Sequence, residues 1–257
     1  MPEISERMRE IIQNELKEIE KSQNVRIIHC IESGSRAWGF ASPDSDYDVR
    51  FIYVRPLEHY LQLGKSRDVI EWKLDDTLDI NGWDIQKALR LLYNANPTLF
   101  EWNLSPIVYK SSDEWKKVSD IMNKYFVQKS GLYHYLSMAK GNYREYLKGE
   151  TVRLKKYFYV IRPLLACEWI LDRKTPPPVL FTDLAEHYVD ENIAPAIQNL
   201  IEIKKKTPEI GEGPRIDELN NYIEDKLRDI EKRIEELPPV EKNTWDELNK
   251  LFSSFVL

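Results

Sequence analysis

The sequence has few residues of the kinds that build disulfide frameworks or zinc centres. Only two of its 257 residues are cysteines, Cys30 and Cys167, and both stand in apolar surroundings far apart in the chain. We therefore expect two buried thiols and no disulfide. The histidines show no spacing typical of a metal site or a catalytic triad, so we expect them to be packing or surface residues. They are His29, His59, His134 and His187.

Long apolar runs and an excess of positive charge are also missing. No run approaches the ~18 apolar residues that cross a bilayer, and residues 1–6 lack the basic and apolar regions of a leader peptide. We therefore expect a cytoplasmic protein without a membrane partner. The 37 Lys and Arg against 43 Asp and Glu give a net charge of −6, which argues against a general basic surface for nucleic acid.

Apolar and charged residues occur in ordinary proportions, but the charges are unevenly distributed along the chain. Apolar residues make up 42% of the chain and charged residues 31%, which is typical of a globular protein. Residues 130–174 carry nine Lys and Arg against four Asp and Glu, whereas residues 208–257 carry seven against thirteen. An anionic ligand would therefore find its counter-charge in the middle of the chain.

The first 108 residues mix helical and strand patterns. Asp75 and Asp76 fit the turn of a β-hairpin, and Asp84 fits the N-cap of the helix after it. The predicted helices are 4–20, 57–63 and 84–93, and the predicted strands are 25–31, 49–54, 68–74 and 77–83.

Beyond Pro106 the periodicity is helical throughout, and we predict no strand there. The predicted helices are 112–126, 130–148, 150–171, 189–206 and 214–236. The expected architecture is α+β, with a mixed sheet and helices in residues 1–108 and a helical bundle in residues 109–257.

A pair of small residues followed by two acids gives the clearest chemical signal. A strand runs into Gly34 and Ser35, where small side chains let backbone N–H groups and a hydroxyl approach a phosphate at the start of a short helix. Eleven residues after Ser35, Asp46 and Asp48 stand two apart as a strand begins, so both carboxylates can share a divalent cation. Either half alone is most often structural, but their joint spacing predicts a phosphate and metal site.

This spacing resembles the signature of the DNA polymerase β-like nucleotidyltransferase superfamily. Within it, the chain is similar to the bacterial RlaP/YcgL family, which is named for an association with RNA repair. From Pro176 onward no segment carries a specific resemblance. The similar segments are Ser35–Phe40, Ile80–Leu89, Asn96–Trp102, Ser105–Tyr109, Lys155–Tyr159 and Arg162–Leu165.

The resemblance implies a third carboxylate on a neighbouring strand. Asp79, between Leu78 and Ile80, is the first choice because it has the setting of an acid that emerges from a sheet. Asp84 is the second choice, although its strand parity places it on the opposite face from Asp79. With Asp46 and Asp48, the third acid would bind two Mg²⁺ ions around a nucleoside triphosphate, for which ATP is expected, and could accept the proton of the attacking hydroxyl.

Cationic residues would complete the triphosphate site. Ser35 and Arg36 would contact the β and γ phosphates, although Arg36 could instead pair with Asp44 or Asp46. In the basic middle segment, Lys155, Lys156 and Arg162, with the ring of Tyr159, fall on adjacent helical stripes and could form a triphosphate wall. A solvated helix face is the alternative for each of these residues, and Lys87 and Glu101 are expected to be structural.

The resemblance further implies transfer of a nucleoside monophosphate to an acceptor hydroxyl, with residues 1–108 as the nucleotidyltransferase domain and residues 109–257 closing the nucleotide cleft. The family name points to an RNA end as acceptor. A small-molecule hydroxyl and a protein hydroxyl are alternatives. A nucleotide-binding module that keeps the fold without turnover, like the antitoxin-like members of the superfamily, is the rival from another class.

Overall fold

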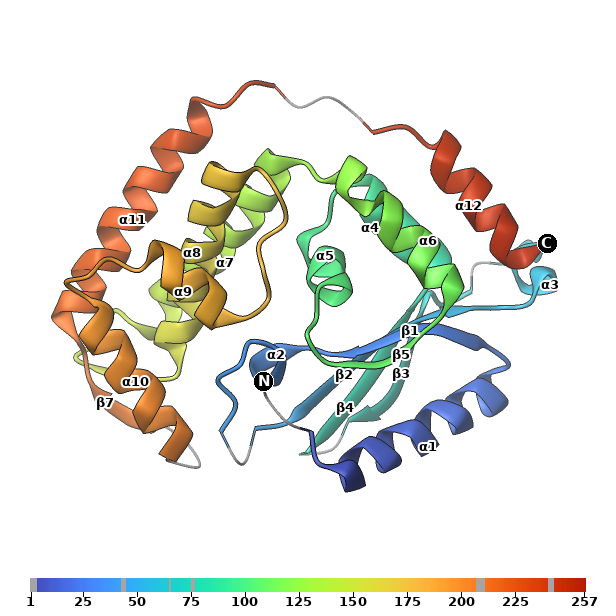
Figure 1. The fold of residues 1–257 in the computed structure, drawn as a ribbon, viewed down its shortest axis with the longest axis horizontal. Coiled ribbons are helices and arrows are strands. Elements are labelled where there is room, and N and C mark those ends of the chain that lie inside the picture. Colours follow the sequence, from blue (N-terminus) through green and yellow to red (C-terminus); the bar gives the residue numbers. More distant parts are fainter. Residues whose placement is uncertain (1–3, 43–44, 65, 75–76, 207–210, 240–242) are drawn as a thin grey trace. The chain divides into compact units, whose positions relative to one another are not determined.

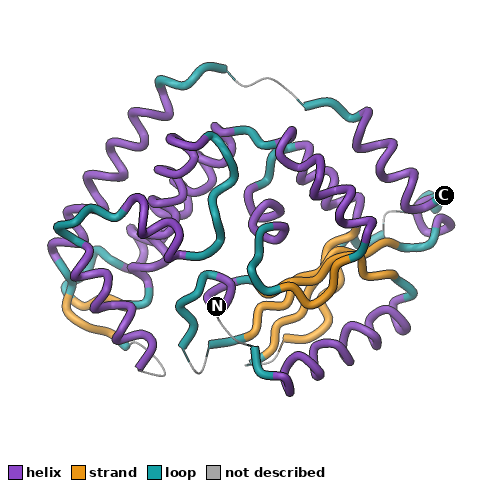
Figure 2. The backbone as a smooth tube through the Cα atoms, viewed as in Figure 1, coloured by secondary structure: helices purple, strands orange, loops and turns teal. Residues whose placement is uncertain are grey.

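The chain folds into two compact units. The computed structural model describes residues 4–42, 45–64, 66–74, 77–206, 211–239 and 243–257. Unit 1 comprises residues 1–37, 46–125 and 242–257, and unit 2 comprises residues 38–45 and 126–241. Most strands belong to unit 1, whereas unit 2 is mainly helical (Figure 2). The fold class is therefore α+β.

Unit 1 is built on a mixed five-stranded sheet. β2 and β4 pair in parallel, whereas the other neighbouring strands pair antiparallel. The parallel pair brings the starts of β2 and β4 to the same edge of the sheet. In spatial order the strands are β3 (Val69–Leu74), β4 (Leu78–Asp84), β2 (Tyr47–Val54), β1 (Arg26–Glu32) and β5 (Val108–Ser111).

Helices cover both faces of this sheet. α1 (Glu6–Gln23) lies on one face, where its buried residues Ile12 and Leu16 join the core formed by the strands. α4 (Ile85–Tyr93) and α6 (Asp113–Met122) lie on the other face (Figure 1). The 3₁₀ turn Asn123–Tyr125 follows α6. The predicted α1 and α4 are confirmed within a few residues at each end.

Shorter helices complete unit 1. α2 (Gly34–Ala37) follows β1, which confirms the predicted short helix after Gly34. α3 (Leu57–Tyr60) follows β2, and α5 (Pro97–Asn103) holds Glu101. α12 (Asp246–Val256) returns from the end of the chain and packs on α4 and α6.

Unit 2 is a helical bundle with one small sheet. α7 and α8 form its central helix pair, and their apolar faces join those of α9 and α11 in one core. The helices are α7 (Gln128–Tyr146), α8 (Lys156–Arg173), α9 (Phe181–Tyr188), α10 (Ala194–Lys206) and α11 (Asp217–Glu235). β6 (Thr151–Arg153) pairs antiparallel with β7 (Glu212–Pro214).

The prediction of no strand beyond Pro106 is wrong. β5 adds to the edge of the main sheet beside β1, and β6 occupies the start of the segment predicted as a helix over 150–171. These strands have only three or four residues, too few to show a period, and β6 depends on a partner about 60 residues away. The predicted hairpin is present as β3 and β4, but its turn residues Asp75 and Asp76 lie outside the described residues.

The boundaries of the two units also differ from the single boundary expected at residue 108. Unit 1 continues to Tyr125 because β5 joins its sheet and α6 packs on β1. It also takes in the end of the chain, where the Trp245 ring stacks on the Tyr93 ring at a centroid distance of 3.8 Å. Residues 38–45 belong to unit 2, where Phe40 packs in the helical core.

Candidate active site

The turn between β1 and α2 is shaped around the carboxylate of Asp48. Gly34 has a φ of +59°, and a Cβ atom at this position would lie only 2.1 Å from Asp48 Oδ2. The backbone N–H of Ser33 donates to the carbonyl of Asp48 at 2.8 Å. Glycine is therefore required at residue 34 both for its backbone conformation and for the space that the carboxylate fills.

Asp48 and Asp79 are direct neighbours in the sheet. They occupy the same register position of the parallel strands β2 and β4. The guanidinium of Arg50 bridges them, because Nη2 donates to Asp48 Oδ1 at 3.0 Å and to Asp79 Oδ2 at 2.7 Å. The structure thus places a carboxylate pair with one shared cation beside Gly34.

The surroundings make Asp48 harder to ionise. Burial raises the pKa of its carboxyl above the ordinary value, the charge of Arg50 lowers it, and the charges of Asp79 and Asp46 raise it again. Asp46 thus lies close enough to act electrostatically on Asp48, although its own side chain is exposed. Three acids therefore concentrate negative charge at the start of β2 and β4.

Asp84 lies away from this pair. It follows Asp79 by five residues, or about 16 Å along a strand, and the alternating burial of β4 places it on the opposite face. Its carboxylate caps α4 by accepting the N–H of Gln86 at 2.8 Å, and it accepts the hydroxyl of Tyr60 at 3.1 Å. Of the two predicted third acids, the structure brings Asp79, and not Asp84, together with Asp48.

Glu32 is a buried acid of the site that the sequence analysis did not identify. Its Oε1 accepts the backbone N–H of Asp48 at 2.9 Å, and its Oε2 accepts the hydroxyl of Tyr109 at 2.6 Å. Burial raises the pKa of Glu32 to about 7, although both hydrogen bonds lower it. The sequence contained one signal for Glu32, because this acid ends an apolar strand directly before Ser33 and Gly34.

Arg36 lies beside the acids and contacts the segment that carries Asp46. Its Nε donates to the backbone carbonyl of Asp46 at 3.1 Å, and its guanidinium lies 3.7 Å from the centroid of the Tyr47 ring. Its alternative partner Asp44 lies outside the described residues. The roles of Arg36 and of the half-buried Ser35 toward phosphates stay predictions.

The predicted triphosphate wall lies on α8 and just before it, in unit 2. Lys156 Nζ lies 3.9 Å from the centroid of the Tyr146 ring and 4.9 Å from that of Tyr159. Burial, followed by the charge of Lys155, lowers the pKa of Lys156. These contacts leave the phosphate role of Lys155 and Lys156 a prediction.

Arg162 has the contacts of an interior side chain. It is 1% exposed, its Nε and Nη2 donate to the carbonyl of Val179 at 3.2 Å, and it lies 4.7 Å from the centroid of the Trp38 ring. These bonds tie α8 to the segment before α9. A contact of Arg162 with phosphate stays a prediction.

The residues expected to be structural have ordinary structural contacts. Lys87 on α4 forms an ion pair with Asp68 at 3.2 Å. The buried His29 ring stacks on Trp115 at a centroid distance of 4.4 Å. Cys30 and Cys167 are buried, free thiols, as expected.

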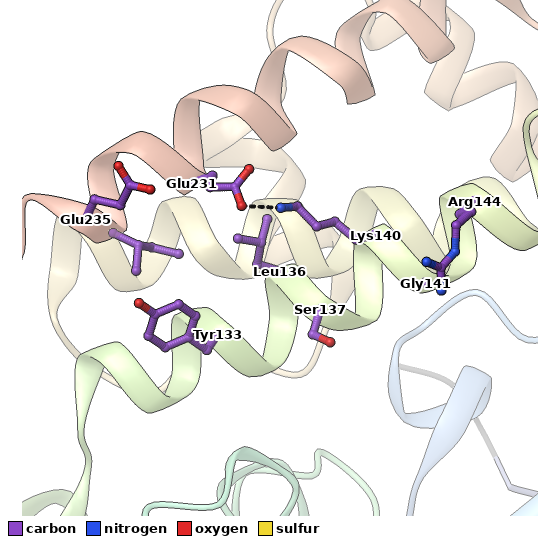
Figure 3. Close-up of a pocket in the computed structure, with 9 residues that line it drawn as sticks. Tyr133, Leu136, Ser137, Lys140, Gly141, Arg144, Glu231 and Glu235 are labelled. Carbon is purple, nitrogen blue, oxygen red and sulfur yellow. Dashed lines mark hydrogen bonds and ion pairs between the residues drawn. The ribbon is translucent and has the colours of Figure 1, made fainter.

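Unit 2 also has a cavity of about 570 Å³ between α7 and α11. Tyr133 lies at one end and Arg144 at the other, and Lys140 forms an ion pair with Glu231 across it (Figure 3). Arg144 and Lys140 are matched by Glu231 and Glu235, so this lining has no excess of positive charge for a triphosphate. The motif residues of unit 1 do not line it.

Two general features are absent from the described residues. Within the described ranges, no group of three or more His, Cys, Asp or Glu side chains is gathered in an arrangement that could hold a metal ion. None of the described helices is both long and apolar enough to span a membrane.

Comparison with known proteins places the chain in a family. A protein of Bacillus subtilis (strain 168), "Uncharacterized protein YcgL", is 43% identical over 251 residues, which are 97% of this chain and 96% of that protein. A solved structure of a nucleotidyltransferase-like protein from Exiguobacterium sibiricum 255-15 is similar with a TM-score of 0.31 and 12% identity, over 89% of this chain and 74% of that chain.

The family model of RlaP, the RNA repair pathway DNA polymerase beta family, matches residues 8–254. This range covers the sheet with Asp48 and Asp79 as well as the helical unit, so the match is not confined to the short motif. The chain belongs to the RlaP family of polymerase β-like nucleotidyltransferases.

Proposed function

We propose that the chain transfers a nucleoside monophosphate from a nucleoside triphosphate to an acceptor hydroxyl, with release of pyrophosphate. The observation that carries this proposal is the juxtaposition of Asp48 and Asp79 on adjacent parallel strands, with Asp48 packed against Gly34. A carboxylate pair beside a glycine turn offers a cation-binding edge next to backbone that a phosphate can approach.

The chemistry of the carboxylate pair fits magnesium. Asp48 and Asp79 offer carboxylate oxygens, which Mg²⁺ prefers together with substrate phosphates. Asp46 is proposed as a third ligand, although in this structure the three acids are not gathered in a metal-binding arrangement. The guanidinium of Arg50 already lies between two of these acids, which indicates that the pair accommodates a shared positive charge. Bound Mg²⁺ would supply neutralisation of phosphate charge and activation of the attacking hydroxyl.

The chain's own residues would position the substrate and move one proton. Asp79 is the expected acceptor of the hydroxyl proton, because it is the third acid, which the neighbouring strand β4 places beside Asp48. Ser35 and Arg36 would contact the β and γ phosphates from α2. Lys155, Lys156 and Arg162 are proposed only as additional phosphate contacts from unit 2.

An RNA end is the acceptor that the family description favours. The test incubates the full chain and Mg²⁺ with each of the four nucleoside triphosphates, labelled at the α-phosphate, and with RNA, protein extract or small hydroxyl compounds. We expect label on RNA that ribonuclease releases, with ATP as the preferred donor. Label on protein or a small molecule instead would change the acceptor, and no transfer to any of them would contradict the proposal.

A further inference from the structure

Arg50 holds the carboxylate pair by one end of its guanidinium and the backbone by the other. Nη2 donates to Asp48 and Asp79, as described above, whereas Nη1 donates to the carbonyls of Val49 and Asp79, each at 3.0 Å. The Arg50 side chain is only 15% exposed, compared with 32% for Asp48 and 25% for Asp79. The guanidinium is therefore the innermost charge of the group.

One nitrogen of Arg50 thus anchors the guanidinium to the backbone, and the other pairs it with the two carboxylates. Because Nη1 is bonded to backbone carbonyls, the guanidinium can stay on β2 and β4 when Nη2 gives up a carboxylate oxygen. A cation that approaches Asp48 and Asp79 from solvent meets oxygens already shared with Nη2, and it meets the repulsion of a fixed positive charge. Arg50 thus acts on any cation at this pair without being a ligand itself.

We propose that Arg50 is a positioning residue that serves as the resident counter-ion of Asp48 and Asp79 in the metal-free protein, and that it lowers the affinity of this pair for Mg²⁺ by competing for the same oxygens. This inference rests on the proposed function, in which these acids bind Mg²⁺. It explains how two adjacent acids remain together while no metal is bound. It also implies that the affinity measured without nucleotide is weaker than three carboxylates would otherwise give.

The test is a calorimetric titration of the full chain with Mg²⁺ alone, in the wild-type protein, Arg50→Met and Arg50→Gln. We expect both variants to bind Mg²⁺ at least about tenfold more tightly, since a positive charge about 3 Å from the ligands is removed. Their metal-free forms should melt at a lower temperature, and Mg²⁺ should raise their melting temperature more than that of the wild type. A purely structural Arg50 would lower the melting temperature without changing the affinity.

Arg55 provides a matched control. It follows the other end of β2, where its Nη1 donates to the carbonyl of Gln23 at 3.0 Å. Arg55→Met should leave the Mg²⁺ affinity unchanged. At residue 50, Arg50→Gln keeps hydrogen-bond donors without the charge, so it preserves the test if Arg50→Met does not fold.

The outcomes separate this inference from the proposed function. If the wild type binds Mg²⁺ through Asp48, shown by loss of binding in Asp48→Asn, but both Arg50 variants bind within twofold of it or more weakly, only the role of Arg50 is overturned. If Asp48→Asn binds like the wild type, or if neither the wild type nor the Arg50 variants bind, the metal assignment fails and the inference fails with it. Binding that appears only in the Arg50 variants and depends on Asp48 supports both.

Discussion

Single residues decide which acid completes the carboxylate group. Asp79 and Asp84 each follow an apolar residue on β4, but only Asp79 shares a register position with Asp48. Strand parity is local and can be read from the sequence, so the opposite faces of Asp79 and Asp84 were predictable. The bridge by Arg50 depends on the pairing of β2 with β4, which no local pattern reveals.

Substitution of the two acids should therefore have different effects. Asp79→Asn should leave nucleotide binding largely intact and lower the rate of transfer by about 10² or more, because the proton acceptor is lost. Asp84→Ala should lower the free energy of unfolding by about 1–2 kcal/mol, because it removes the cap of α4 and the acceptor of Tyr60. Transfer kinetics and urea unfolding of both variants check this, and the reverse pattern would contradict the assignment.

The buried His29 predicts how stability depends on pH. Burial lowers the pKa of His29 to about 4 in the folded chain, from 6.5 for the ordinary group. As pH falls from 7 to 5 the unfolded chain takes up this proton first, so His29 should remove about 2 kcal/mol of stability.

The measurement is urea unfolding at both pH values for the wild type and for His29→Phe, which keeps a ring against Trp115. The other titratable groups are present in both proteins, so the difference between their two losses of stability isolates the effect of His29. The variant should lose about 2 kcal/mol less than the wild type between pH 7 and 5, and equal losses would show that His29 does not carry the effect.

At the scale of elements, prediction succeeded where the signal was local. α1 and α4 have helical periods and N-caps, β1 and β2 are short apolar runs, and all four form within a few residues of the predicted ranges. β5, β6 and β7 are too short to show a period, and they exist because distant segments pair with them. The turn from β1 to α2 was predictable because glycine readily adopts the positive φ that a tight turn of this kind requires.

That turn gives a prediction with an internal control. Gly34→Ala should lower the free energy of unfolding by about 1–3 kcal/mol and weaken Mg²⁺ binding, because its Cβ would displace the Asp48 carboxylate. Gly141→Ala on α7 should instead stabilise the chain by about 0.5–1 kcal/mol, since a Cβ there would meet none of the described neighbouring side chains within 4 Å. Equal stability changes in the two variants would contradict the role given to Gly34.

At the scale of the whole molecule, sequence order does not match the division into units. Residues 242–257 return to unit 1, and residues 38–45 of the motif segment join unit 2. The expected boundary at residue 108 followed the change from mixed to helical periodicity. Long-range packing of α12 and of Phe40 decides the units, and the sequence pattern does not contain this information.

The last residues of the chain pack on unit 1, so we expect the stability of unit 1 to depend on them. A chain that ends at residue 242 would lose the Trp245–Tyr93 stack and the bonds from Asn243 Nδ2 to the carbonyls of Tyr93 and Tyr125. We expect faster amide hydrogen exchange in α4 and in β1, β2 and β4, with smaller changes in α7 and α8. Unchanged protection of α4 would contradict this role of the chain end.

The proposed reaction is tested most directly by following the two ends of the triphosphate separately. The full chain is incubated with Mg²⁺, RNA and ATP labelled at either the α- or the γ-phosphate, in the wild-type and Asp48→Asn proteins. The proposed reaction predicts α-label on the RNA, γ-label in pyrophosphate, and neither product with Asp48→Asn. Transfer of the γ-label to RNA, or undiminished α-label transfer by Asp48→Asn, would contradict nucleotidyl transfer at the site of Asp48 and Asp79.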